Sequence, residues 1–284
     1  MLSKKYKIRF SITLLFLAIL FALMHGCMRF RTSDSKAKKE FIEKKHQPHF
    51  HSYKVGTRTI HYVECGNDSL PSVIFIHGSP GSWDAYKKYM MDDTLLRSVR
   101  VIAPDRPGFG YSDFGDSEPS LEMQAEVLKP LLLKEKNKVI LVGHSYGGPV
   151  IARMAIDFPE NIKGLLFIAG SIAPQHEKVT WYQKILYRRP LKWIVPSAFR
   201  VSGEEILPLK IELTEMLPGW EKITTPTIVL QGDEDVLVPK ENADFAEKML
   251  TNAPKEIIRI KDENHFIPWT KPKMVKDAIL KLNR

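Results

Sequence analysis

A serine set between two glycines follows directly on a short apolar run in the middle of this chain. The run occupies residues 138–142, and the sequence Gly-His-Ser-Tyr-Gly follows at 143–147. Apolar, β-branched runs of this length predict buried strands, and the glycines predict a crowded turn into a helix. A serine on such a turn exposes its hydroxyl at the top of a sheet, where a base can reach it. The pattern therefore favours folds in which a buried strand ends in a candidate nucleophile, Ser145.

Similar apolar runs recur along the chain and alternate with longer segments. This spacing predicts an α/β fold with a mostly parallel central sheet flanked by helices. The first run alternates in polarity, as an early edge strand would. Because ligands bind beyond the carboxyl ends of parallel strands, the residues that follow each strand are candidates for the site. The predicted strands are residues 59–63, 72–76, 99–103, 139–142, 164–170, 227–231 and 256–260.

Short motifs stand at these strand ends, and their order along the chain resembles the α/β-hydrolase family. The resemblance covers about residues 50–284 and implies the α/β-hydrolase fold with a helical lid insertion, as in its serine-dependent esterase and lipase branch. The motifs are His-Gly-Ser-Pro-Gly at 77–81, Asp-Arg-Pro-Gly-Phe-Gly-Tyr-Ser at 105–112, the Ser145 turn, Gly-Asp-Glu-Asp at 232–235 and His265.

The resemblance implies a catalytic triad. Ser145 is expected to be the nucleophile, and His265, which lies in the loop after the last predicted strand, the general base and acid. The family places the acid three residues after the loop glycine, which favours Asp235, and Asp233 is the alternative. Asn264 stands where relatives often have glycine, and asparagine tolerates left-handed backbone better than most residues.

The same resemblance implies an oxyanion hole built from two backbone N–H groups, those of Ser79 and Tyr146. Pro80 has no N–H and cannot contribute. The 105–112 segment is expected to be mainly structural. Neither a metal nor a cofactor is expected.

A long segment, residues 174–219, separates the strands at 164–170 and 227–231 and is expected to form the lid. Its five prolines predict short helices. Residues 178–200 contain six Lys or Arg, no acidic residue and several aromatics, of which Trp181, Tyr182 and Trp193 are candidates for the lid or substrate site. Two interpretations stay open. The aromatics line the pocket under solvated cations, or the segment lies on an anionic membrane.

The N-terminus combines a basic start with an apolar run at residues 10–24, which predicts that residues 1–28 are an export signal. It is either a lipoprotein signal, with lipidation at Cys27, or a retained membrane anchor; a buried core helix is the remaining alternative. Residues 29–48 are expected to be a flexible basic linker, and residues 49–173 and 220–284 the hydrolase core. This organisation places the core outside the cytoplasm at a bacterial membrane.

The charge distribution argues against a nucleic-acid partner. The net charge is +9, but residues 1–45 contain eleven Lys or Arg and three Asp or Glu, so this tail carries +8 of it. The core is close to neutral and lacks the basic surface that nucleic acid requires. The two cysteines, Cys27 and Cys65, do not make a disulfide framework.

The sequence therefore predicts a membrane-tethered serine hydrolase that acts on a small acyl substrate. A carboxylic ester, possibly lipid-derived, is favoured. Hydrolysis of a carbon–carbon or amide bond, a slow or non-catalytic ligand-binding receptor and a membrane scaffold are the alternatives. A serine nucleophile disfavours the epoxide-hydrolase and dehalogenase branches, which resemble this chain in other motifs but use aspartate at that position.

Overall fold

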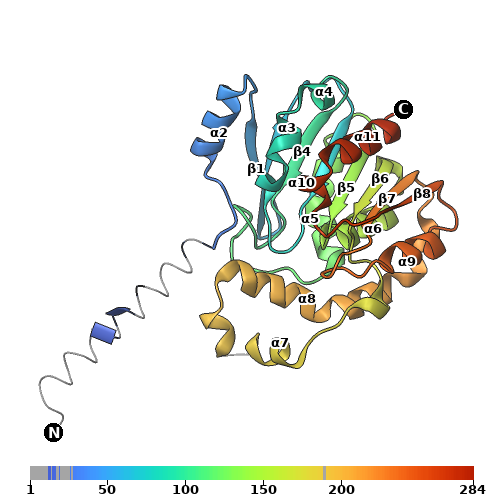
Figure 1. Cartoon of the computed structure of the whole chain (residues 1–284). Helices are drawn as coiled ribbons and strands as arrows, with labels where there is room; N and C mark the ends of the chain where they lie inside the picture. The colour runs from blue at the N-terminus through green and yellow to red at the C-terminus, as the bar shows by residue number, and fades with distance from the viewer. Residues whose placement is uncertain (1–11, 14, 17–18, 20–25, 27, 188–189) are drawn as a thin grey trace, which may run out of the picture.

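The computed structural model describes residues 12–13, 15–16, 19, 26, 28–187 and 190–284. Its centre is an eight-stranded sheet in the order β1-β2-β4-β3-β5-β6-β7-β8 (Figure 1). The pairs β1–β2 and β2–β4 are antiparallel, and every later pair is parallel. The strands are β1 His49–Val55, β2 Arg58–Cys65, β3 Ser72–Ile76, β4 Arg100–Pro104, β5 Val139–His144, β6 Ile162–Ile168, β7 Thr227–Gly232 and β8 Lys255–Ile260.

The predicted edge strand is an inner one. The run at 59–63 lies in β2, which is paired on one side with β1 and on the other with β4. β1 forms the edge, and its side chains are exposed or half-buried. Its mixture of histidine, serine and lysine suits a strand with only one neighbour, and it gave no apolar signal in the sequence.

Helices cover both faces of the sheet, and side chains of each inner strand alternate between the two apolar layers. In β3, Ile74 and Ile76 enter the layer formed with α5, α6 and α9, whereas Val73 and Phe75 enter the layer formed with α2, α3 and α11. The helices are α2 Asp34–Glu43, α3 Lys87–Met90, α4 Asp93–Leu96, α5 Leu121–Leu133, α6 Gly147–Asp157, α7 Trp181–Leu186, α8 Ser197–Met216, α9 Asn242–Met249, α10 Ile267–Thr270 and α11 Pro272–Leu282, with 3-10 turns η1 Trp83–Tyr86, η2 Pro159–Asn161, η3 Pro174–His176, η4 Leu191–Ile194 and η5 Leu217–Lys222.

The insertion between β6 and β7 contains η3, α7, η4, α8 and η5, and α7 and α8 lie side by side below the sheet in Figure 1. The expectation that all its helices are short is wrong for α8, which has 20 residues and contains Pro208. A proline removes one backbone hydrogen bond from a helix. Burial of Leu209, Leu213 and Met216 beyond the proline ties the rest of α8 to the core.

The segment 29–48 is not the flexible linker expected from its composition. Residues Asp34–Glu43 form α2, and Ser33 caps its first turn by accepting a hydrogen bond from the Lys36 N–H. Ala37 and Phe41 lie four residues apart on one face and are fully buried. The five lysines from 36 to 45 are exposed, which is why the composition of the segment did not indicate a helix.

Most of the predicted signal segment, residues 1–28, lies outside the described residues, as does the candidate lipidation residue Cys27. Among the helices that the structure describes, none has the length and hydropathy needed to cross a bilayer.

Candidate active site

Ser145 lies on a sharp turn between β5 and α6. Its φ of +54° is left-handed, a conformation that costs a residue other than glycine roughly 1–2 kcal/mol. Hydrogen bonds on both sides hold the turn: the Ser145 N–H donates to the Ile168 carbonyl at 3.0 Å, and the Ser145 carbonyl accepts from the Ser171 N–H at 3.1 Å. The neighbouring strand β6 therefore fixes the strained backbone that presents the hydroxyl.

Gly147 allows α6 to start directly beside β3. A Cβ atom there would lie 2.2 Å from the Ile76 carbonyl oxygen, a distance that no side chain can accept. The residue thus sets how close the serine turn lies to the loop after β3, which contains Gly78 and Ser79. A Cβ on Gly78 would in turn lie 3.0 Å from the Cβ of Ser145.

Asp235 and His265, from the loops after β7 and β8, are hydrogen bonded to each other. The His265 Nδ1 lies 2.7 Å from the Asp235 Oδ2, and both side chains are almost fully buried. The other oxygen, Oδ1, accepts backbone N–H bonds from Leu237 and Val238 at 2.9 and 2.8 Å. These bonds keep Asp235 aimed at the imidazole, which leaves Nε2 for a second partner. Asp233, the alternative acid, is not hydrogen bonded to His265 in this part of the chain.

His144, directly before Ser145, connects the serine turn to the histidine loop. Its Nε2 lies 3.0 Å from the His265 carbonyl oxygen and donates to it, and the two rings lie 4.7 Å apart. Burial, together with the neighbouring His265, lowers the pKa of His144 to about 3, so it is neutral at physiological pH. The described hydrogen bonds include none between Ser145 Oγ and His265, and such contacts are often long until substrate binds.

Asn264 precedes His265, at the position where glycine in relatives suggested a left-handed backbone. Asn264 does not have a left-handed φ; the left-handed residue of this loop is Asp262, with a φ of +55°. Asn264 instead caps the next turn, because its Oδ1 accepts the Phe266 N–H at 2.8 Å.

The two expected oxyanion donors lie beside Ser145. Tyr146 follows it in the chain, and Ser79 follows Gly78 in the loop after β3. Within the described residues, neither backbone N–H has a hydrogen-bond acceptor, so both could donate to a substrate oxygen. The Tyr146 side chain is buried, and burial beside Glu205 raises its pKa, so its phenol stays neutral.

A buried ion pair, which the sequence analysis did not identify, supports the Ser79 loop from beneath. Arg106 and Glu205 have no exposed side-chain surface, and the guanidinium Nη1 lies 2.7 Å from the Glu205 Oε1. The same guanidinium donates to the carbonyls of His77 and Gly78, and Glu205 accepts from the Ser79 hydroxyl at 3.0 Å. Helix α8 of the insertion is thereby joined to the oxyanion loop.

The 105–112 segment has the structural role expected of it. The fully buried Asp105 accepts hydrogen bonds from the backbone N–H groups of Trp83 and Tyr111 and pairs with His61 at 2.9 Å. His61, which matched no motif in the sequence, is therefore a structural residue. The carboxylate anchors the turns that place Arg106.

Two of the three aromatic residues named as candidates for the lid or substrate site are largely exposed. Trp181 is 74% exposed and Trp193 is 54% exposed. The position of Tyr182 in α7 is described, but its side chain lies outside the described part of the structure.

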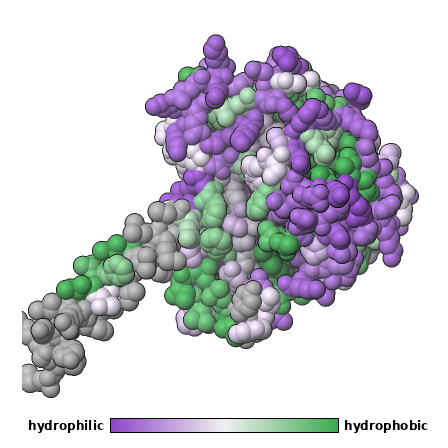
Figure 2. All heavy atoms as spheres, viewed as in Figure 1, coloured by the Kyte–Doolittle hydropathy of each residue, from purple (hydrophilic) through white to green (hydrophobic). Residues whose placement is uncertain are grey.

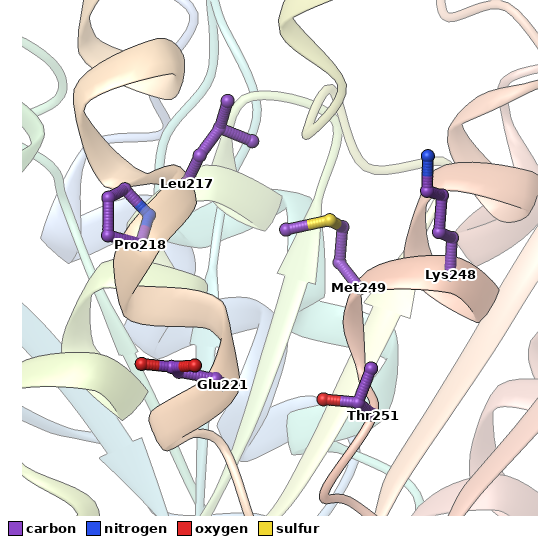
Figure 3. A pocket seen from close by; sticks show the side chains of 6 residues that line it. All are labelled: Leu217, Pro218, Glu221, Lys248, Met249 and Thr251. Carbon is purple, nitrogen blue, oxygen red and sulfur yellow. The ribbon is translucent and has the colours of Figure 1, made fainter.

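A pocket of about 340 Å³ lies away from these residues, between η5 and the end of α9 (Figure 3). It is found at the amino ends of β7 and β8, on the sheet edge opposite the candidate catalytic groups. Its lining contains none of them, so it supports no catalytic role. The lining residues are Leu217, Pro218, Glu221, Lys248, Met249 and Thr251.

Comparison with known proteins agrees with this architecture. Residues 71–193 match the family model described as alpha/beta hydrolase fold. A solved structure of a membrane phospholipase A, titled a novel bacterial virulence factor, superimposes with a TM-score of 0.65 at 19% identity, covering 99% of this chain and 98% of that one. The chain has the α/β-hydrolase fold. At that identity, the structural match shows only that this α/β-hydrolase shares the fold.

Curated relatives of this α/β-hydrolase differ in how much of their length they share with it. Bifunctional epoxide hydrolase 2 of Sus scrofa is 30% identical over 130 residues, which is 45% of this chain and 23% of that protein. Poly(3-hydroxyalkanoate) depolymerase of Ectopseudomonas oleovorans is 27% identical over 258 residues, 77% of this chain and 86% of that protein. The chain spans well under half the length of the first curated relatives that it matches.

Proposed function

We propose that this α/β-hydrolase is a serine esterase that cleaves a carboxylic ester through an acyl-enzyme, tethered to a membrane by its N-terminal segment. One observation carries the catalytic part: the buried Asp235–His265 hydrogen bond of 2.7 Å lies beside a serine on a left-handed turn. That arrangement supplies an oriented base to a nucleophile at the carboxyl edge of the sheet.

In the first step, Ser145 Oγ attacks the ester carbonyl carbon while His265 Nε2 takes the hydroxyl proton. Asp235 stabilises the imidazolium that forms and keeps its Nδ1–H in place. The carbonyl oxygen becomes an oxyanion and accepts the N–H groups of Ser79 and Tyr146. The tetrahedral intermediate collapses, the carbon–oxygen bond to the alcohol breaks, and His265 gives its proton to the leaving alkoxide.

In the second step, water repeats the sequence on the acyl-enzyme. His265 takes a proton from water, the resulting hydroxide attacks the acyl carbon, and the carboxylic acid leaves as Ser145 regains its proton from His265. The oxyanion is thus stabilised by the N–H groups of Ser79 and Tyr146, and the imidazolium of His265 by Asp235.

An apolar ester suits the surroundings of the site. Val236 and Leu237 follow the acid, Phe266 follows the histidine, and all three are exposed. An exposed apolar rim beside catalytic groups favours an acyl chain over a charged substrate. The relative matched over most of both chains is named a depolymerase of poly(3-hydroxyalkanoate), a polyester, which is consistent with ester cleavage.

The tether rests on the sequence of residues 1–28. Basic residues precede the apolar run at 10–24, which is the charge order of an export signal. This pattern supports an anchor or lipoprotein signal that holds the catalytic body on the outer side of a bacterial membrane.

A fluorophosphonate probe tests the catalytic proposal directly. Labelling is expected for the wild-type chain and for Ser171→Ala, a serine that contacts the same turn through its backbone, but not for Ser145→Ala. Absence of labelling in a folded wild-type chain would overturn the proposal. A panel of p-nitrophenyl esters of graded chain length then measures the acyl preference, with longer esters expected to give higher kcat/KM.

A further inference from the structure

The insertion presents a concentrated set of exposed apolar side chains. Five lie within fourteen residues of the chain, and Figure 2 shows hydrophobic surface gathered at the lower left of the molecule, where α7 and the start of α8 lie in Figure 1. We call it the insertion's apolar surface. Contiguous apolar surface of this kind marks a contact with another apolar phase or a partner. Its residues are Trp181, Ile185, Leu191, Trp193 and Ile194.

Cations accompany this surface. Lys178 and Lys184 are exposed. Lys192 and Arg200 lie over the Trp193 ring at 5.2 and 4.9 Å, and both also pair with Glu204 of α8. Residues 178–200 contain no Asp or Glu. Aromatic and aliphatic side chains bordered by Lys and Arg are the composition of segments that lie in the headgroup region of anionic membranes.

The residues that follow the N-terminal apolar run contact the body beside α8. Phe30 packs edge-on against Phe199 of α8, with ring centroids 5.3 Å apart, and Arg31 stacks over Tyr111 at 4.1 Å. From Phe30, six residues lead back to Met24, the end of the run, a span of at most about 20 Å. A bilayer that holds the run therefore passes close to the start of α8.

We propose that the insertion's apolar surface docks on an anionic lipid bilayer, the same bilayer that holds residues 10–24. The proposal rests on the proposed tether and adds a second contact, which turns the insertion toward the lipid. A second copy of the chain is a poorer occupant, because pairing two such surfaces would bring the exposed Lys178 and Lys184 of each copy together.

The test uses the full chain with a fluorescent NBD label at one of two matched positions. Ile194→Cys places the label in the insertion's apolar surface, and Leu133→Cys places it at the end of α5; the native side chains are 58% and 60% exposed. Leu133 lies near the amino end of β5, on the sheet edge opposite the insertion. Both variants carry Cys27→Ser, and Cys65 stays unlabelled because it is buried, which raises its pKa to about 11.

Each labelled chain is reconstituted with vesicles of phosphatidylglycerol and phosphatidylcholine, and flotation and NBD emission are measured. The expected result is that both chains float, while only the Ile194 label shifts to shorter wavelength and is quenched by spin-labelled lipid. The shift should be smaller in pure phosphatidylcholine.

Three outcomes overturn the proposal, and they are distinguishable. Flotation with a water-like Ile194 label refutes docking and leaves the tether intact. Failure to float refutes docking together with the retained-anchor form of the tether, which is the form that Cys27→Ser leaves, while hydrolysis of soluble p-nitrophenyl acetate reports separately on the catalytic proposal. A blue shift of the Ile194 label without lipid, rising with protein concentration, assigns the surface to a second copy instead.

Discussion

Replacing Glu205 by alanine tests the connection between the insertion and the oxyanion hole. Glu205 lies on α8, forms a bidentate pair with Arg106 at 2.7 and 3.1 Å, and accepts further bonds from Gln124 and Ser79. Burial raises the pKa of Glu205, and the Arg106 guanidinium opposes that rise. Alanine removes the carboxylate and leaves a guanidinium with no exposed surface and no counter-charge.

The stability cost follows from that isolated charge. Breaking a buried ion pair by removing one partner costs about 3–5 kcal/mol, a large part of the 5–15 kcal/mol that holds a typical domain together. For a chain of this size, the loss corresponds to a fall in melting temperature of roughly 6–20 °C. Arg106→Met with Glu205→Leu removes both charges and should recover most of the loss.

Activity should fall as well, because the pair holds the peptide that contains one oxyanion donor. The Gly78 carbonyl accepts from Arg106 at 3.2 Å and from His77 at 2.7 Å. In a trans peptide the N–H points away from the carbonyl, so these bonds aim the Ser79 N–H. Displacing Arg106 should lower kcat toward the roughly 10²–10³-fold loss caused by removing one oxyanion donor, with little change in KM.

Urea unfolding and steady-state hydrolysis of a p-nitrophenyl ester measure both effects. Asp277→Ala is the control, because it breaks an exposed pair with Lys273 and should change stability by less than about 1 kcal/mol. The reasoning is refuted if Glu205→Ala is as stable as the control, or if it is unstable but retains wild-type kcat under conditions where it is folded.

Three further predictions follow from the site and the fold. Asp235→Asn should lower kcat by about 10⁴-fold, whereas Asp233→Asn should stay near wild type; equal losses would contradict the assignment of the acid. Because the pKa of His144 is lowered to about 3, its contribution to stability is present above pH 6.5 and is lost as the pH falls toward 3. Urea midpoints at pH 7 and pH 5 should therefore differ less in His144→Gln, and an unchanged difference would count against this. Phe41→Ala should cost about 3–5 kcal/mol in thermal or urea unfolding, against under about 0.5 kcal/mol for the exposed Ile42→Ala; two small values would mean that α2 is not part of the core.

The sheet and the catalytic loops were predictable because their signals are local. Each inner parallel strand is a short run of β-branched and aliphatic residues, and the candidate groups follow these runs directly. Ser145 and His265 are therefore found from one strand end each. Asp235 needed the spacing from Gly232, and its hydrogen bond to His265 separates it from Asp233.

The elements that were missed depend on contacts between distant parts of the chain. The Arg106–Glu205 pair joins residues 99 positions apart, and nothing near either residue indicates that it is buried. Helix α8 passes through Pro208 because packing of its second half on the core outweighs the lost backbone bond. In α2 the sequence does contain a helix signal, namely the N-cap Ser33 and the buried pair Ala37 and Phe41. The many lysines around them favoured the linker interpretation instead.

The helix α2 also has a kinetic consequence for a tethered enzyme. A flexible 20-residue linker would have a root-mean-square end-to-end distance of about 25 Å, so the catalytic body could move away from its anchor into bulk solution. In the proposed tethered arrangement, the contacts of Phe30 and Arg31 with the body would instead keep the catalytic groups at a nearly constant height above the bilayer. Turnover of a membrane-borne ester should then obey surface-dilution kinetics, rising with the mole fraction of substrate in the lipid plane and not with its total concentration in the suspension.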